Sequence, residues 1–276
     1  MKILFVGVFT EGSTNISQYN SLTTLGHAVD EFPYRSIPNC NVHLETHSGY
    51  DVVLIAKGTG ITTNTIKQLK RYNGKIVYWF PDPAISFTSE MIDKTAISDI
   101  AFFDKLGTLD IAKTVNENSH YICEGYDSKV DIMHDVEKEY DVSFIGNVYG
   151  NRASVLEHLT GVNDVKVISS AYGVQHAIEV GKSKINLNIC TDGCASDRIY
   201  KSLAAGGFIL TDDWYGRELT GLVDGADLVI YNNISDLQTK IKYYLHHEDL
   251  RTKISHSGLN RVKDLNRINW AKEIVK

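Results

Sequence analysis

The stretch that decides the fold is "YDVSFIGNVYGNRASVLEHLTG" (140–161). Its pattern predicts a buried strand over 141–145, a turn at Gly146 and a helix that opens near Asn151. Apolar residues recur on one face of this helix, and Gly161 is expected to end it. A strand that runs through a glycine-bearing loop into a helix is the repeating unit of parallel α/β sheets.

The same unit occurs at the start of the sequence, in "MKILFVGVFTEGSTNISQYNSLTTLGH" (1–27). Here an apolar strand leads into a loop with glycine and then into a helix that is expected to end near Gly26. Strands and helices alternate after both units, and strands such as "DVVLIA" (51–56) are apolar without interruption. Such strands are typical of parallel sheets covered on both faces. We therefore predict two Rossmann-like α/β domains.

The boundary between these domains is indicated by "EGYDSKVDIMHDVEKEYD" (124–141), which is rich in charge and poor in apolar pattern. Exposed linkers have this composition. We expect an N-terminal domain over 1–125, a linker over 126–140 and a C-terminal domain over 141–260. The last helix, over 261–276, has one apolar stripe with which it could pack back on the N-terminal domain.

Composition limits the class of protein. The 276 residues are 43% hydrophobic, which supports real cores, and no apolar run approaches the length of about 18–20 residues that spans a bilayer. A net charge of −6 argues against non-specific binding to nucleic acid, although it permits a local basic groove. Four cysteines are too few for a disulfide framework, and Cys190 and Cys194 lack a matching pair for zinc. We expect a cytoplasmic monomer with no membrane segment.

The turn of the second strand–helix unit is the first candidate site. Gly146 and Asn147 lie between a strand and a helix N-terminus, where backbone N–H groups and the helix dipole favour an anion such as phosphate. Arg152, in the first helical turn, can pair bidentately with an oxyanion. Many α/β domains have such a loop without a ligand. The loop does not match the P-loop pattern, and neither unit contains G-x-G-x-x-G, which counts against a dinucleotide cofactor.

A second candidate site lies in "CASDRIYKSLAAGGF" (194–208). Arg198, Lys201 and Ser202 share one face of the predicted helix because they are spaced i, i+3 and i+4. Cationic side chains at a helix N-terminus oppose the helix dipole, and a bound diphosphate would account for them. A solvated face of arginine and lysine is the alternative interpretation.

Several stretches of the second half together resemble the C-terminal half of the CgeB-like group of family-1-type glycosyltransferases. They are "ICEGYDS" (122–128), "DVSFIGNVYGNR" (141–152), "SDRIYKSLAAGGFILTDDWYGREL" (196–219) and "LVIYNNISDLQTKIKYYLHHEDLRTKISHSGLNRV" (228–262). The resemblance implies a GT-B fold, in which two Rossmann-like domains face each other across a cleft. It also implies a nucleotide-sugar donor, with a UDP-sugar favoured, held mainly by the C-terminal domain.

The resemblance assigns roles to single residues as well. It implies that Arg198 contacts the diphosphate of the donor and that Glu218 contacts hydroxyls of the sugar. The family commonly has a glutamate, which binds the ribose hydroxyls, at the position of Lys201. A lysine cannot accept those hydrogen bonds, so we expect ribose recognition to differ in this chain.

Asp82 is the candidate catalytic residue. In "KIVYWFPDPAISF" (75–87) it follows an apolar strand and lies between two prolines, which restrict the backbone on both sides. This segment is also similar to the strand-and-turn segment of the DNA β-glucosyltransferase of T-even phages, and the similarity implies that Asp82 is a general base. A base on the face opposite the leaving group implies inversion at the sugar C1. The alternative is a Pro-Asp-Pro turn with a solvated carboxylate.

The acceptor is expected near "TEGST" (10–14), which follows the first strand. Gly12 would permit close approach, and Glu11 is a candidate for acceptor binding. The phage resemblance favours hydroxymethylated pyrimidine in double-stranded DNA as the acceptor, ahead of a small molecule, a glycan or a protein. It predicts a basic rim on the N-terminal domain, formed by Lys57, Lys67, Lys70 and Arg71, which could equally be a solvated helix face.

These features together predict an inverting glycosyltransferase that uses a nucleotide-sugar donor. A divalent metal is not expected to be essential, because Arg152, Arg198 and Lys201 could stabilise the departing diphosphate. Two alternatives stay open. One is a sugar-nucleotide epimerase, for which the sequence offers no additional acid–base pair. The other is a non-catalytic module that binds a sugar nucleotide, an alternative that Lys201 favours.

Overall fold

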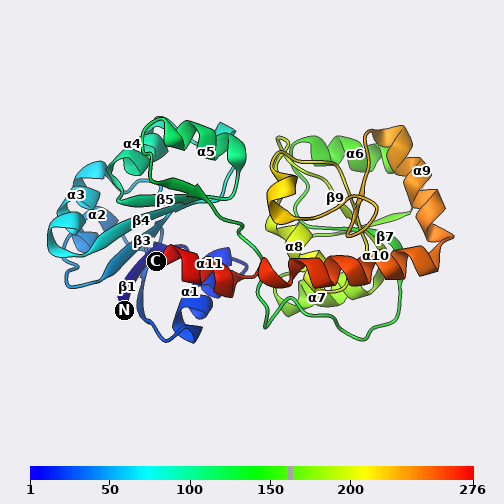
Figure 1. Ribbon diagram of the computed structural model, residues 1–276, viewed down its shortest axis with the longest axis horizontal. Helices are drawn as coiled ribbons and strands as arrows, with labels where there is room; N and C mark the ends of the chain where they lie inside the picture. The colour runs from blue at the N-terminus through cyan, green and yellow to red at the C-terminus, as the bar shows by residue number, and fades with distance from the viewer. Residues whose placement is uncertain (161–163) are drawn as a thin grey trace. The chain divides into compact units, whose positions relative to one another are not determined.

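The computed structural model describes residues 1–160 and 164–276, and the chain divides into two compact units (Figure 1). The first unit contains Met1–Glu124 together with Arg267–Lys276, and the second contains Gly125–Asn266. Each unit is a parallel α/β domain, as predicted. In the described part of the chain, no helix combines the length and the apolar character that crossing a bilayer requires.

The first unit is built on a six-stranded parallel sheet with the order β2-β1-β3-β4-β5-β6. Its strands are β1 (Lys2–Gly7), β2 (Ala28–Pro33), β3 (Val52–Ala56), β4 (Lys75–Phe80), β5 (Ile100–Phe103) and β6 (Ser119–Tyr121). Its helices are α1 (Thr14–Thr24), α2 (Cys40–Leu44), α3 (Thr63–Tyr72), α4 (Ser89–Ile97), α5 (Leu106–Lys113) and α11 (Arg267–Ile274).

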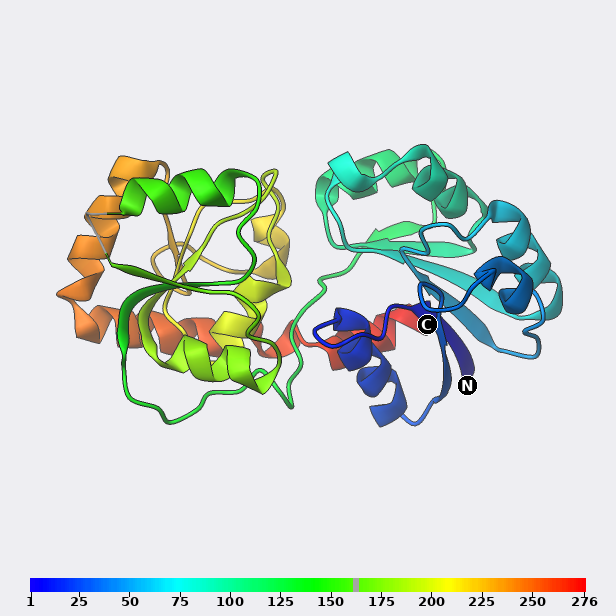
Figure 2. The same ribbon diagram turned by 180° about the vertical axis from the view of Figure 1, so that it is seen from behind.

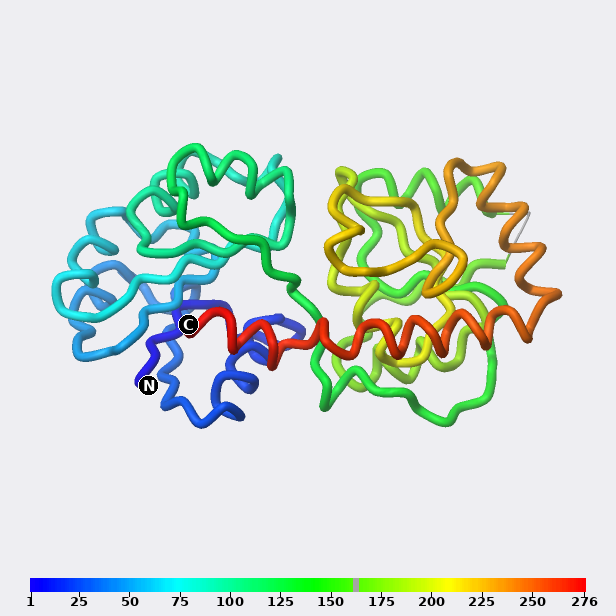
Figure 3. Tube along the Cα trace, in the orientation of Figure 1, coloured from blue at the N-terminus to red at the C-terminus, as the bar shows by residue number. Residues whose placement is uncertain are grey.

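Helices cover both faces of this sheet, which is why its central strands are apolar throughout. In β4, Tyr78 and Phe80 pack into the cluster formed with α2 to α5, whereas Trp79 packs on the opposite face. Figure 2 shows α1 and α11 side by side on that opposite face. The rings of Trp79 and Trp270 meet edge to face, with centroids 5.6 Å apart. The C-terminal segment therefore completes the core of the first unit. Both ends of the chain belong to this unit, as the trace in Figure 3 shows.

The second unit is built on a five-stranded parallel sheet with the order β11-β10-β9-β7-β8. Its strands are β7 (Tyr140–Ile145), β8 (Val165–Ile168), β9 (Ser183–Asn188), β10 (Ile209–Thr211) and β11 (Val229–Ile230). Its helices are α6 (Asn151–Leu159), α7 (Val174–Gly181), α8 (Asp197–Ala204), α9 (Ile234–Leu245) and α10 (Glu248–Arg261). Gly161, expected to end α6, lies outside the described residues.

Of residues 126–140, which were expected to form a linker, 126–139 contain neither helix nor strand and pack on the second unit, and Tyr140 begins β7. The ammonium of Lys138 donates hydrogen bonds to the carbonyls of Gly181 and Ser183, at 2.7 and 2.9 Å. Met133 lies against Gly206, where an added Cβ would come within 3.0 Å of its sulfur. The segment thus covers the ends of α7 and α8.

Each sheet has one point at which the strand order reverses direction. It lies between β1 and β3 in the first unit and between β7 and β9 in the second. In doubly wound sheets the loops on either side of this point diverge, and ligands bind there, outside the carboxyl ends of the strands. Glu11 and Gly12 lie in the loop after β1, Gly146 and Asn147 lie in the loop after β7, and Arg198 lies at the start of the helix after β9. Asp82 and Glu218 follow the neighbouring strands β4 and β10.

Candidate functional site

Arg198 lies at the reversal point of the second sheet. It is the second residue of α8, and its guanidinium carbon lies 4.8 Å from the ring centroid of Phe144 in β7. Its Nη1 donates a hydrogen bond to Oδ1 of Asn188, at the end of β9, at 3.2 Å. Gly146 makes room for the guanidinium, because a Cβ at this position would lie 2.9 Å from Cζ of Arg198. Gly146 and Arg198, which were predicted separately from the sequence, therefore pack directly against each other.

Arg152 reaches the same place from α6. Its side chain is buried, with Nε donating to the carbonyl of Ile189 at 3.2 Å and Nη1 donating to the carbonyl of Asn147 at 3.1 Å. The guanidinium also lies 4.3 Å from the ring centroid of Tyr149. Arg152 thus ties the loop after β7 to the end of β9, a structural role that the sequence did not indicate. These bonds use two of the five N–H donors that an arginine carries.

The charges of the two arginines oppose each other. Burial, followed by the positive charge of Arg152, lowers the pKa of Arg198 to about 10. Among the described residues, neither guanidinium forms a salt bridge with a carboxylate. Two like charges held together away from water destabilise the free protein. An anion with two or more negative charges would remove the repulsion, and guanidinium groups bind such anions strongly.

The rest of the predicted cationic face differs from the expectation. Lys201 pairs with Asp197 one turn earlier on α8, with Nζ 2.5 Å from Oδ2, so its charge is balanced locally. Ser202 is only 3% exposed and faces the interior, so it does not share an open face with Arg198. The reason is that α8 packs against β9 and β10 on one side and α10 on another. Periodicity placed these residues on one face but could not indicate how much of it is covered.

A histidine that the sequence did not single out lies beside this helix. His176 on α7 is 7% exposed, and burial lowers its pKa to about 3. The positive charges of Lys201 and Arg198 act in the same direction, whereas Asp197 opposes them. Neither ring nitrogen has a hydrogen-bond partner in the described structure. The imidazole is therefore neutral at pH 7. A lone histidine in a short helix gives no signal of this kind in a sequence.

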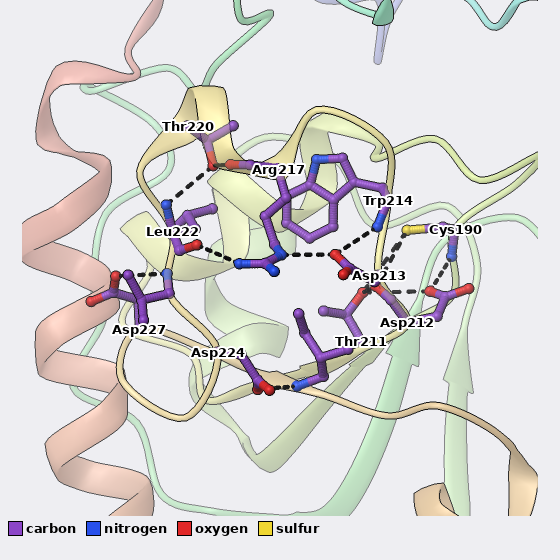
Figure 4. A network of polar contacts seen from close by, with 12 residues as sticks. Cys190, Thr211, Asp212, Asp213, Trp214, Arg217, Thr220, Leu222, Asp224 and Asp227 are labelled. Atoms are coloured by element: carbon purple, nitrogen blue, oxygen red, sulfur yellow. Dashed lines mark hydrogen bonds and ion pairs between the residues drawn. The ribbon is translucent and has the colours of Figure 1, made fainter. Parts of the chain in front are cut away.

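Glu218 belongs to the loop that follows β10, and Figure 4 shows the hydrogen bonds that hold this loop. The residue lies in the short 3₁₀ helix Arg217–Thr220 and is exposed. Arg217 fixes this helix, because its Nε donates to Oδ1 of Asp213 at 2.7 Å and its Nη1 donates to the carbonyl of Leu222 at 2.8 Å. The carboxylate of Glu218 is thus presented to solvent by a loop with its own hydrogen-bond network.

Asp212 and Cys190 join the ends of β10 and β9. Oδ1 of Asp212 accepts a hydrogen bond from the amide of Cys190 at 2.8 Å, and burial raises the pKa of the Asp212 carboxyl. Burial and the nearby carboxylate raise the pKa of the Cys190 thiol well above its ordinary value. Cys190 is therefore an unreactive thiol at neutral pH. In the part of the chain that the structure describes, no three His, Cys, Asp or Glu side chains are grouped to hold a metal ion.

In the first unit, Asp82 follows β4 directly and does not stand alone. Its Oδ2 lies 2.5 Å from Nζ of Lys57, and about a third of each side chain is exposed. Its carbonyl accepts a hydrogen bond from Oγ1 of Thr108 at 2.9 Å. Lys57, expected at a basic rim, is instead the partner of the candidate base. The sequence could have indicated this pair only through the neighbouring positions of β3 and β4.

Glu11 and Gly12 are exposed in the loop after β1, where Gly12 has a φ of +79°. The loop is anchored by Asn15, whose Oδ1 accepts a hydrogen bond from the amide of Val8 at 2.8 Å. Because β1 and β4 both flank β3, the loops with Glu11 and Asp82 lie at the same edge of the sheet.

The predicted basic rim is weaker than expected. Lys70 pairs with Asp99, with 2.5 Å between Nζ and Oδ1, and Lys57 pairs with Asp82. Only Lys67 and Arg71 of the four cations are exposed without a carboxylate partner in the described structure.

Comparison with known proteins gives the family. A family model described as glycosyl transferase-like matches residues 130–274, which is more than half of the 276-residue chain. The chain belongs to this glycosyl transferase-like family. Among curated protein sequences, none is significantly similar to it.

Several solved structures of similar fold cover nearly the whole of this chain. HepE of Anabaena in complex with UDP-glucose superposes with a TM-score of 0.69 at 11% identity, covering 99% of this chain and 98% of HepE. A glycosyltransferase from Rickettsia africae gives 0.67 at 13% identity, covering 100% of this chain and 98% of its own. Sucrose-phosphate synthase from Thermosynechococcus elongatus gives 0.71 at 11% identity, with 99% and 97% covered.

The two-domain GT-B fold predicted from the sequence is thereby confirmed, as is the relationship to glycosyltransferases. The narrower resemblances to the CgeB-like group and to the phage enzyme stay predictions.

Proposed function

We propose that the protein transfers a sugar from a nucleotide-diphosphate sugar, with a UDP-sugar favoured, to an acceptor hydroxyl. The observation that carries this proposal is the pair Arg152 and Arg198, two guanidiniums at one sheet edge, neither of which forms a salt bridge among the described residues. The diphosphate gains negative charge as its bond to the sugar breaks, and fixed cations stabilise it most at that stage. The UDP and UDP-glucose complexes of HepE support this class of donor.

In this proposal Asp82 is the general base. Its carboxylate takes the proton of the acceptor hydroxyl as the oxygen attacks C1 of the sugar, a contribution of about 10²- to 10⁴-fold. Attack from the side opposite the diphosphate inverts the configuration at C1. Glu218 accepts hydrogen bonds from sugar hydroxyls, and the loop with Glu11 and Gly12 contacts the acceptor. We expect the arginines to make a divalent metal dispensable.

For the acceptor, the ion pairs of Lys57 and Lys70 reduce the positive charge that a DNA-binding rim needs. This favours the hydroxyl of a glycan or a small molecule over a hydroxymethylated base in duplex DNA. A salt-dependent gel shift with a hydroxymethylcytosine duplex distinguishes the two. Binding that weakens steeply with salt would restore the DNA acceptor and the phage-type relationship.

Calorimetric titration with UDP and UDP-glucose tests the donor, and release of UDP from a panel of nucleotide sugars tests turnover. Arg198→Met should weaken UDP binding about 10- to 100-fold, since hydrogen bonds between charged groups contribute about 1.5–3 kcal/mol. Arg35→Met, which changes an exposed arginine of the first unit, is the matched control.

Each alternative gives a different outcome. Failure to bind any sugar nucleotide contradicts the proposal. Isomerisation at C2 without transfer indicates an epimerase. Binding without turnover indicates a non-catalytic module.

A further inference from the structure

The loop that carries Lys57 has an unfavourable backbone conformation. Lys57 has a φ of +59°, which residues with a side chain rarely adopt. Gly58 follows at +63°, and a Cβ there would lie 2.7 Å from Cγ2 of Ile55. The chain therefore leaves β3 through two successive left-handed residues, of which only one is glycine. Such a conformation persists only where the surroundings impose it.

Buried side chains hold this loop by its backbone. The hydroxyl of Tyr78, which is fully buried, donates to the carbonyl of Lys57 at 3.0 Å. Nζ of Lys94 donates to the carbonyl of Gly58 and to Oε1 of Glu90, both at 2.5 Å. The same Oε1 accepts the amide of Gly60 at 2.7 Å. Side chains of β4 and α4 thus fix three peptide groups in four consecutive residues.

The ammonium of Lys94 is an unusual anchor, because its side chain is 0% exposed. Burial lowers the pKa of Lys94, and the bond to Glu90 offsets this only in part. Replacing a whole buried ion pair by apolar residues is often neutral or stabilising, so stability alone does not account for the Lys94–Glu90 pair. The strained loop and the buried charge are two separate costs. Together the strained loop and the buried Lys94 hold the ammonium of Lys57 at 2.5 Å from Oδ2 of Asp82.

We propose that Lys57 is a positioning residue for Asp82, and that the Lys94–Glu90 pair holds Lys57 in place for this purpose. The inference rests on the proposed function, in which Asp82 is the general base. Lys57 binds Oδ2 and fixes the rotation of the carboxylate, so that Oδ1 is directed to the acceptor. As the acceptor oxygen bonds to C1, its proton moves to Oδ1, and the electrons of the broken C1–O bond stay on the departing diphosphate.

Hydrolysis of UDP-glucose tests the inference without knowledge of the natural acceptor, because water takes the acceptor's place. Two substitutions separate positioning from stability. Lys57→Met removes the ammonium. Lys57→Gly removes it and also relieves the positive φ, which offsets the greater freedom of glycine in the unfolded chain. Both should lower kcat for UDP release about 10- to 100-fold. The dissociation constant for UDP should not change, and the melting temperature of Lys57→Gly should stay at or above that of the wild type.

A double substitution tests whether Lys57 acts through Asp82. Asp82→Asn should lower kcat about 10²- to 10⁴-fold. Adding Lys57→Met to it should lower kcat no further, because the group that Lys57 positions is already lost. Lys94→Met should retain the fold, lower kcat in the same direction as Lys57→Met and speed amide hydrogen exchange in residues 57–61. Lys113→Met, at the exposed end of α5, is the control and should leave kcat unchanged.

The outcomes distinguish this inference from the proposed function. Full hydrolysis by Asp82→Asn, or none by the wild type, contradicts the proposed function and the inference with it. If Asp82→Asn is impaired while Lys57→Met and Lys57→Gly keep the wild-type kcat, only the inference is overturned. Additive losses in the double variant also overturn it, since Lys57 would then act independently of Asp82.

Discussion

The guanidinium of Arg198 is partly buried beside that of Arg152, and its pKa is lowered to about 10 chiefly by that burial. Arg198→Met fills a similar volume without charge. We expect it to raise the free energy of unfolding by about 1–3 kcal/mol while it weakens UDP binding. Urea denaturation and calorimetric titration of the same samples measure the two effects. A less stable variant would indicate that the contacts with Asn188 and Phe144 outweigh the repulsion.

His176 gives the second unit a dependence on pH. Its pKa is about 3 in the folded protein, against 6.5 for an ordinary histidine. Between these values the unfolded chain binds more protons than the folded chain, so stability falls as pH falls. From pH 6.5 to pH 5 this residue alone should lower the free energy of unfolding by about 2 kcal/mol. Full stability is reached above pH 6.5.

His176→Leu should remove that part of the pH dependence, which urea denaturation at pH 7, 6 and 5 measures. His246→Leu, which changes an exposed histidine of the same unit, should leave it in place. Equal pH dependence in wild type and His176→Leu would show that the imidazole is already charged or hydrated in the folded protein.

Substitution by alanine should have opposite effects on stability at two helical glycines, because one is tightly packed and the other is not. In α10, a Cβ at Gly258 would lie 2.7 Å from Cδ2 of Leu203 and closer still to the carbonyl of Asp227. In α5, a Cβ at Gly107 would meet nothing within 4 Å. Gly107→Ala should therefore stabilise the protein by about 0.5–1 kcal/mol through helix propensity. Gly258→Ala should destabilise it by about 1–3 kcal/mol despite the same gain in propensity. Thermal unfolding of both variants measures the contrast.

The central strands that are buried on both faces were predicted from the sequence. The runs "DVVLIA" and "KIVYWF" became β3 and β4 because helices cover both sides of the central strands. The edge strand β2 was not predicted, since Asp30 and Glu31 lie exposed within it and interrupt the apolar pattern. The three-residue strand β6 is too short to show any pattern.

Some residues of the candidate site were predicted from local sequence patterns, whereas others are brought together only by strand pairing. Gly146 and Arg198 were found from local patterns, because a glycine turn and a helix start each have a signature of their own. The pair Lys57 and Asp82 depends on the pairing of β3 with β4, in which Ala56 lies opposite Trp79. The two residues are far apart in the sequence, and each has a plausible local role. No local pattern therefore connects them.

At the scale of the whole molecule, α11 belongs to the core of the first unit although it follows the second in the sequence. Trp270 is 1% exposed and contacts Trp79. Trp270→Ala should destabilise the first unit by about 3–5 kcal/mol, the usual cost of removing a buried tryptophan. Calorimetry should show one transition moved to lower temperature and the other in place. Leu237→Ala, in the core of the second unit, should move the other transition instead. A shift of both by either variant would mean that the units unfold together.

The division of the first unit into two segments has a consequence for its synthesis. A ribosome makes residues 1–124, then the whole second unit, and only then α11. At about 5–20 residues per second, the interval is on the order of 10–30 s. During that time the sheet face around Phe5 and Trp79 has no covering from α11. The first unit therefore cannot complete this face of its core until α11 has been made, although its strands are the first part of the chain to be translated. Chaperones that bind apolar surface have this interval in which to act on the first unit.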